Sequence, residues 1–100
     1  MKFTLKGPFG ENVYNLMRKI GYHFLKKDEK SGELNFVRLL ERGGYPRFHL
    51  YLKVENGNLI FNLHLDQKRP IYKGTTAHSG EYSGEIVGKE AKRIKQILKI

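Results

Sequence analysis

The dipeptide Asn56-Gly57, within the string "YLKVENGNLIFNL", constrains the fold of this chain more than any other stretch. Asn-Gly between two runs of alternating hydrophobic residues is typical of a type I′ turn, which joins two antiparallel strands. The pattern therefore predicts paired strands over Phe48–Val54 and Leu59–Leu65. Because a two-residue turn also fixes the register, His49 should lie directly opposite His64, and Arg47 opposite Asp66.

This register divides the predicted hairpin into an apolar face and a polar face. The apolar face would hold Phe48, Leu50, Leu52, Val54, Leu59, Phe61, Leu63 and Leu65. The polar face would hold Arg47, His49, Tyr51, Lys53, Ile60, Asn62, His64 and Asp66. A slip of one residue would mix the two sets, so the hydrophobic pattern supports the register. We expect the apolar face to pack against helices, leaving the polar face open or covered only by a loop.

Three further strands and two helices are predicted around this hairpin. Alternation over Met1–Lys6 predicts a strand, and Tyr22–Lys27 and Leu34–Leu40 read as two more. Residues 11–22 place apolar side chains on one face of a helix: Val13, Leu16, Met17 and Ile20. Residues 83–100 do the same with Ile86, Val87, Ala91, Ile94, Ile97 and Leu98.

The ends of these helices carry capping residues. Asn12 is suited to cap the first helix, and Gly21 stands where a left-handed C-terminal cap belongs. Ser83 is the corresponding N-cap candidate of the second helix.

The chain is therefore predicted to be a single α+β domain over residues 1–100, with the order β-α-β-β-β-β-α. Four consecutive antiparallel strands and two helices suggest two layers, a single antiparallel sheet with both helices on one face. The order of elements resembles that of TATA-box-binding-protein-like folds. No motif of that family is present, so the resemblance implies no residue role and no activity.

The charge of the chain favours polyanionic partners. The net charge is +9, from 19 Lys and Arg against 10 Asp and Glu, and such a balance suits DNA, RNA or an anionic surface. Solubility alone is the simpler alternative. There is no cysteine, which excludes disulfides and thiolate metal sites. No apolar run is long enough to insert into a membrane and no signal-peptide core is visible, so we expect a cytoplasmic protein.

Our first functional hypothesis is a small nucleic-acid-binding or ribonucleoprotein-associated module. An open sheet face can stack bases and contact phosphates, as in RNA-recognition modules. The segment 67–82 has no regular periodicity and adds positive charge. The candidate contacts to DNA or RNA are Arg47, Tyr51, Lys53, Asn62, Lys68, Arg69 and Lys73. An ordinary polar sheet face is the alternative interpretation.

A second hypothesis is an enzyme that uses histidine and carboxylate groups on a phosphate-containing substrate. Its catalytic candidates are His49, His64, His78 and Glu81. If segment 67–82 folds back over the polar face, a divalent metal could be held by His49, His64, Asp66 and His78. These spacings match no strong metal or protease motif, and no other cofactor is expected. A protein-interaction module that uses a sheet edge is a third possibility, and the sequence leaves the oligomeric state open.

Several strings of the chain resemble those of one group of proteins. "LHLDQK", "TAHSGEY" and "GEIVGKEAKRIK" are similar to strings in small uncharacterised bacterial proteins, particularly those of the candidate phyla radiation. The resemblance spans much of the chain and implies a bacterial origin. It implies no activity, because none is established for that group.

Overall fold

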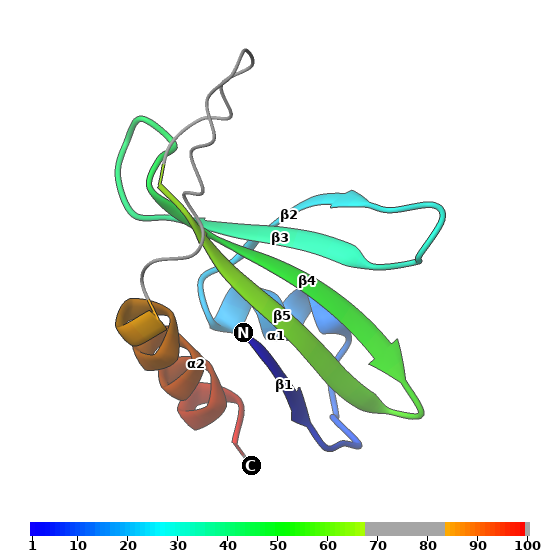
Figure 1. The fold of residues 1–100 in the computed structure, drawn as a ribbon. Coiled ribbons are helices and arrows are strands. Elements are labelled where there is room, and N and C mark those ends of the chain that lie inside the picture. The colour runs from blue at the N-terminus through cyan, green and yellow to red at the C-terminus, as the bar shows by residue number, and fades with distance from the viewer. Residues whose placement is uncertain (68–83, 100) are drawn as a thin grey trace.

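The computed structural model describes residues 1–67 and 84–99 and shows one five-stranded antiparallel sheet with two helices (Figure 1). The strands lie in the order β1-β5-β4-β3-β2. The elements are β1 (Lys2–Leu5), α1 (Val13–Lys19), β2 (His23–Lys27), β3 (Leu34–Leu39), β4 (Arg47–Glu55), β5 (Asn58–Asp66) and α2 (Gly84–Leu98). The predicted α+β class and the predicted order of elements are confirmed.

The central hairpin has the predicted turn and register. Asn56 and Gly57 both have positive φ, 54° and 79°, as a type I′ turn requires. Pairing runs without a break from the turn to the far end, where Arg47 lies opposite Asp66. Both strands are slightly longer than predicted, because the pairing continues beyond the hydrophobic residues at either end.

The first strand of the chain lies beside the last strand, at one edge of the sheet. β1 pairs with β5, and the ammonium group of Met1 donates a hydrogen bond to the carbonyl oxygen of Leu63 over 2.9 Å. At the other edge, β2 pairs with β3 and contains a bulge between Phe24 and Lys26. All five residues of β2 are exposed, as expected of an edge strand.

Helix α1 begins and ends at the predicted caps. The side-chain oxygen of Asn12 accepts a hydrogen bond from the backbone N–H of Asn15 over 2.9 Å. Gly21 has a φ of 89°, the left-handed conformation that stops a helix. Leu16 and Met17 face the sheet and are buried.

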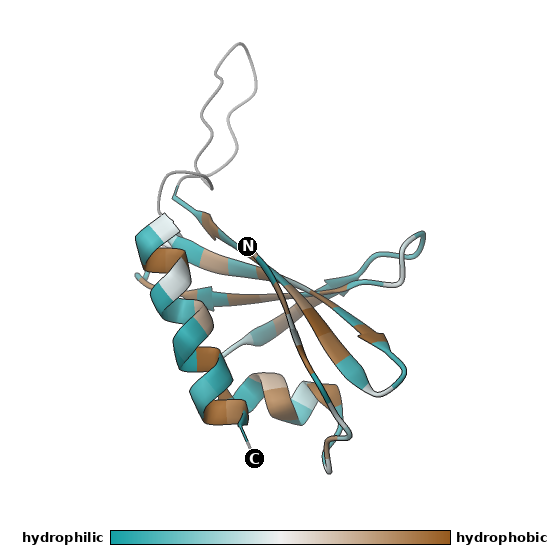
Figure 2. Ribbon diagram, turned by 60° about the horizontal axis from the view of Figure 1, so that its bottom comes forward, coloured by the Kyte–Doolittle hydropathy of each residue, from teal (hydrophilic) through white to brown (hydrophobic). Residues whose placement is uncertain are grey.

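Helix α2 packs on the same face of the sheet, and hydrophilic and hydrophobic residues alternate along it (Figure 2). Its buried apolar residues are Val87, Ala91, Ile94 and Leu98. The prediction was wrong for Ile86 and Ile97, whose exposed fractions are 48% and 42%. Since each helical residue turns by about 100°, both isoleucines fall on the flank that carries Arg93. The four buried apolar residues occupy a separate arc of the helix, and both isoleucines lie outside it, on the far side of Glu90.

The core is one cluster between the sheet and the two helices. Its largest fully buried side chains include Tyr22, Phe36, Phe61, Met17 and Ile20. The predicted N-cap Ser83 lies outside the described residues. Within residues 1–67 and 84–99, neither helix has the length and apolarity needed to cross a bilayer.

Candidate nucleic-acid interface

Among residues 1–67 and 84–99, no helix covers the polar face of the β4–β5 hairpin, because α1 and α2 both pack on the apolar face (Figure 1). The alternation of the two strands leaves residues of the polar face partly exposed, and the cross-strand pairs are those expected from the Asn-Gly turn. The side chains of the polar face define the candidate site.

His49 is the most buried titratable residue of this face, with an exposed fraction of 9%. Its Nδ1 lies 3.1 Å from Oδ2 of Asp66, and its Nε2 lies 3.0 Å from Oδ1 of Asn35. A protonated ring donates to both oxygens. A neutral ring donates a hydrogen bond from one nitrogen only. With Nδ1 donating to Asp66, Nε2 accepts a hydrogen bond if the Asn35 amide is turned so that its NH₂ group faces the ring. Either way both ring nitrogens are engaged, so His49 has no nitrogen free for a substrate or a metal in this arrangement.

Asp66 is held between two groups of the neighbouring strand. Arg47 Nε donates a hydrogen bond to Asp66 Oδ2 over 3.3 Å, which confirms the predicted Arg–Asp pair, and His49 contacts the same oxygen. Burial alone would raise the pKa of this carboxyl group. The hydrogen bonds from His49 and Arg47, together with their electrostatic interactions with the carboxylate, outweigh burial, and the pKa lies below its ordinary value. Asp66 is therefore ionised at neutral pH.

Tyr51 stands at the centre of a small ring cluster. Its ring is stacked on that of His49, with centroids 4.4 Å apart and planes inclined by 11°. The ring of His64 meets it edge-on at 5.6 Å. Burial, followed by the nearby charge of Asp66, raises the pKa of the Tyr51 hydroxyl. The hydroxyl group therefore stays protonated and can donate a hydrogen bond.

His64 is predominantly uncharged at neutral pH. Burial, and then the ammonium group of Met1, lower its pKa, while Asp66 raises it by less. A neutral imidazole beside Tyr51 offers a flat, polarisable surface rather than a positive charge.

A hollow of about 410 Å³ opens on this face, between β2 and the start of β4. It is lined by Leu25, Lys26, Lys27, Asp28, Asn35, Arg47, His49 and Tyr51. The sequence prediction missed the contribution of β2. The alternation of β2 is interrupted by its bulge between Phe24 and Lys26, so the face to which its side chains point could not be assigned from the pattern.

Asp28 belongs to that turn rather than to the chemistry of the hollow. Its Oδ1 accepts hydrogen bonds from the backbone N–H groups of Lys30 and Ser31, which lower its pKa. The fully exposed carboxylate thus stabilises the β2–β3 turn. The cations at the hollow are Lys26, Lys27 and Arg47.

The structure brings together only part of the predicted site. Arg47, Tyr51, Asp66 and the two histidines of the hairpin lie side by side. Farther along the hairpin, Lys53 pairs with Glu55 at 3.6 Å, and Asn62 lies opposite Tyr51. The other predicted residues lie outside the described part of the chain: Lys68, Arg69, Lys73, His78 and Glu81.

The predicted metal site depends on one of those residues. Among residues 1–67 and 84–99, no three His, Asp or Glu side chains gather closely enough to hold a metal ion. The predicted ligands His49, His64 and Asp66 would need His78 to complete their set, and His78 is not described. The metal site and the catalytic role therefore stay predictions.

No model of a known protein family matches the chain, and neither the curated proteins nor the solved structures contain a match. The structure defines a two-layer α+β domain, and the resemblance to small bacterial proteins stays a prediction.

Proposed function

We propose that this protein binds single-stranded nucleic acid on the open face of its sheet. The observation that carries the proposal is the hollow in which the Tyr51 ring lies beside three cations, Lys26, Lys27 and Arg47. Proteins that bind single strands combine these two elements: a ring on which a base stacks and positive groups that follow the phosphates.

Lys26 and Lys27 are the groups best suited to contact phosphates. Both are exposed, and within the described residues neither forms an ion pair. Arg47 differs, because its guanidinium is hydrogen-bonded to Asp66 and contacts the ring of Tyr45. The two lysines can therefore neutralise phosphates without breaking an existing pair, whereas Arg47 is oriented by its partners.

The buried His49 stacks against one face of the Tyr51 ring and holds it in place. It is held at both nitrogens, by Asp66 and Asn35, and its ring is parallel to that of Tyr51. A ring fixed in this way loses little conformational entropy when a base stacks on it. His49 is thus a positioning residue in this proposal.

Lys68, Arg69 and Lys73 belong to the same proposal as additional phosphate contacts. They follow β5 in the sequence, and β5 ends at Asp66 on the open face. Their part rests on charge and sequence position alone.

The proposal is tested by fluorescence anisotropy with labelled single-stranded RNA and DNA of about 12 nucleotides, within the length range of single-strand sites. The wild-type protein should bind more weakly as salt rises, because each neutralised phosphate releases counterions. Tyr51→Ala should weaken binding about 10-fold, since stacking contributes roughly 1–3 kcal/mol per base. The double variant Lys26→Ala/Lys27→Ala should lower the salt dependence by about 1.4 in the log–log slope, at roughly 0.7 per phosphate contact.

Matched controls come from the helical side of the sheet. Tyr14 is an exposed tyrosine of α1, and Lys92 is an exposed lysine of α2. Tyr14→Ala and Lys92→Ala should leave the affinity unchanged. The proposal is wrong if folded wild-type protein does not bind either strand at low salt, or if Tyr51→Ala binds as well as Tyr14→Ala.

A further inference from the structure

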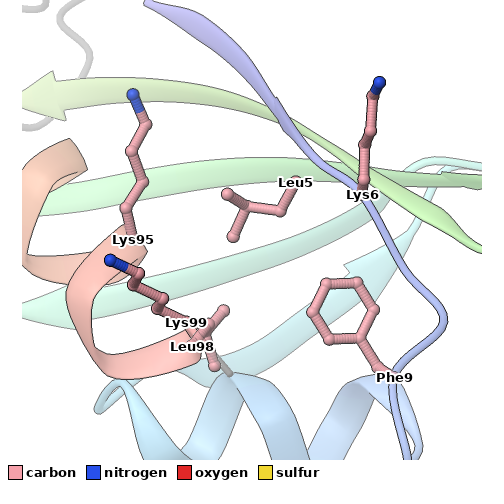
Figure 3. A pocket seen from close by; sticks show the side chains of 6 residues that line it. All are labelled: Leu5, Lys6, Phe9, Lys95, Leu98 and Lys99. Carbon is pink, nitrogen blue, oxygen red and sulfur yellow. The ribbon is translucent and has the colours of Figure 1, made fainter.

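A second hollow lies on the helical side of the sheet, between the end of β1 and the last turn of α2 (Figure 3). Its volume is about 340 Å³, within the range of small-molecule sites. Three apolar residues line it, Leu5, Phe9 and Leu98, together with three lysines, Lys6, Lys95 and Lys99. This hollow is separate from the open face, because Leu5 lies opposite Leu59 on the apolar side of the sheet.

Among the described residues that line this hollow, every charged side chain is a lysine. Within residues 1–67 and 84–99, neither Lys6 nor Lys99 forms an ion pair. The Nζ of Lys95 lies 5.0 Å from the centre of the Phe3 ring, a cation–π contact, and among the described residues Lys95 forms no ion pair. An apolar surface edged by uncompensated ammonium groups is complementary to an anion with an apolar body.

The helix dipole explains only part of this arrangement. Lys95 and Lys99 stand at the C-terminal end of α2, where a cation offsets the partial negative charge of the helix. Lys6 follows β1 and has no helix end to complement. In Figure 3 its side chain rises on the β1 side of the hollow while Lys95 rises on the α2 side, with Leu5 between them. Two elements from opposite ends of the chain therefore place cations at one apolar site.

We propose that this hollow binds an aliphatic monocarboxylate. The alkyl chain would lie against Leu5, Phe9 and Leu98, and the carboxylate would accept hydrogen bonds from the lysines. A carboxylate fits because an ammonium group acts as a compact point charge and needs no bidentate partner. An aliphatic body fits because two of the three apolar residues are leucines, and the third, Phe9, is only partly buried.

The proposal is tested by titrating ¹⁵N-labelled protein with decanoate, below its aggregation concentration, and following amide shifts by NMR. We expect saturable shifts that centre on Leu5, Phe9 and Leu98. The double variant Lys6→Ala/Lys99→Ala should weaken decanoate binding at least 10-fold. Lys92 is an exposed lysine of α2 that does not line the hollow, and the Lys92→Ala variant should bind decanoate as the wild type does.

Four results would overturn the proposal. The first is that decanoate causes no saturable shifts in folded protein. The second and third are that uncharged 1-decanol binds as tightly as decanoate, or that the aromatic anion 2-naphthoate binds more tightly. The fourth is that an oligonucleotide shifts the amides of these residues and decanoate does not. Tyr51→Ala should leave decanoate binding intact, since Tyr51 lies on the opposite face. Failure here and failure of nucleic-acid binding are therefore separate outcomes.

Discussion

Glu90 shows how a single carboxylate can organise the helical side of this protein. Its side chain is 4% exposed and accepts hydrogen bonds from three residues. Tyr22 Oη donates over 2.7 Å, Arg93 Nε over 2.8 Å and Arg38 Nη1 over 3.3 Å. Burial would raise the pKa of Glu90, but these donors outweigh burial and lower it. Burial of the Tyr22 hydroxyl group, together with its hydrogen bond to Glu90, raises the pKa of Tyr22 far above its ordinary value.

Replacing Glu90 should therefore be costly, and the cost should depend on pH. We expect Glu90→Gln to lower the free energy of unfolding at pH 7 by about 2 kcal/mol, in the range for hydrogen bonds to charged groups. A carboxyl group whose pKa is lower in the folded state stabilises the protein above its unfolded pKa and ceases to do so as pH falls through the folded value. Urea unfolding of both proteins should thus show the difference narrowing as pH falls below the ordinary value of 4.5.

The exposed Glu85, in the first turn of the same helix, provides the control. Glu85→Gln should change stability by less than about 0.5 kcal/mol, as is usual for surface substitutions. A difference between wild type and Glu90→Gln that stays constant from pH 7 into acid would contradict an ionised, hydrogen-bonded Glu90.

At the residue scale, the only contacts that could be predicted from the sequence are the cross-strand pairs fixed by the Asn-Gly turn. His49 lies opposite His64, and Arg47 opposite Asp66, because the Asn-Gly turn fixes both pairs. The contact of His49 with Asn35 could not be predicted, because no short turn fixes the register of β3 against β4. The burial of Glu90 was missed for a related reason: Tyr22 and Arg38 are 68 and 52 residues away along the chain.

At the scale of elements, α2 is the helix whose facing the sequence pattern left ambiguous. Six apolar positions were predicted to be buried, but Ile86 and Ile97 are exposed on the flank beside Arg93. A hydrophobic stripe defines the buried direction only within its own width, so the pattern could not show which of its edge positions would be exposed. The hairpin had no such freedom, since a shift of one residue would have exposed its whole apolar face.

Ile94 and Ile97 provide a direct test of the rotation of α2. Ile94 is fully buried, whereas Ile97 is 42% exposed. We expect Ile94→Ala to lower the free energy of unfolding by about 3 kcal/mol, because it removes buried methyl groups and leaves a cavity. Ile97→Ala should cost less than about 0.5 kcal/mol. Chemical denaturation of the two variants would measure both values, and equal costs would mean that the stripe predicted from sequence is the buried one.

At the scale of the whole molecule, the first and last elements close a single core. β1 pairs with β5, and buried residues of α1, α2 and the central strands belong to one cluster. The fold class and this order of elements were predicted from periodicity and turn residues. The pairing of β1 with β5 was not, because pairing between distant segments leaves no local signal in the sequence.

A single core predicts cooperative unfolding. The transition followed by far-UV circular dichroism should coincide with that followed by tyrosine fluorescence, which is the natural probe in a chain with six tyrosines and no tryptophan. Ile94→Ala should move both midpoints together, although the substitution lies in α2 alone. Separate midpoints would show that the helices and the sheet unfold as independent units.

The contact between Gly7 and the hairpin turn bears on where this domain could accept foreign sequence. A Cβ atom at Gly7 would overlap the carbonyl oxygen of Gly57, and the N–H of Gly7 donates to Asn58 Oδ1 over 3.0 Å. The tip of a hairpin is ordinarily a permissive place for an inserted tag or loop. Here the tip packs against Gly7, in the segment that follows β1, and is hydrogen-bonded to it. The position around Gly43, where an added Cβ would meet open space, is the better point of entry for an engineered peptide.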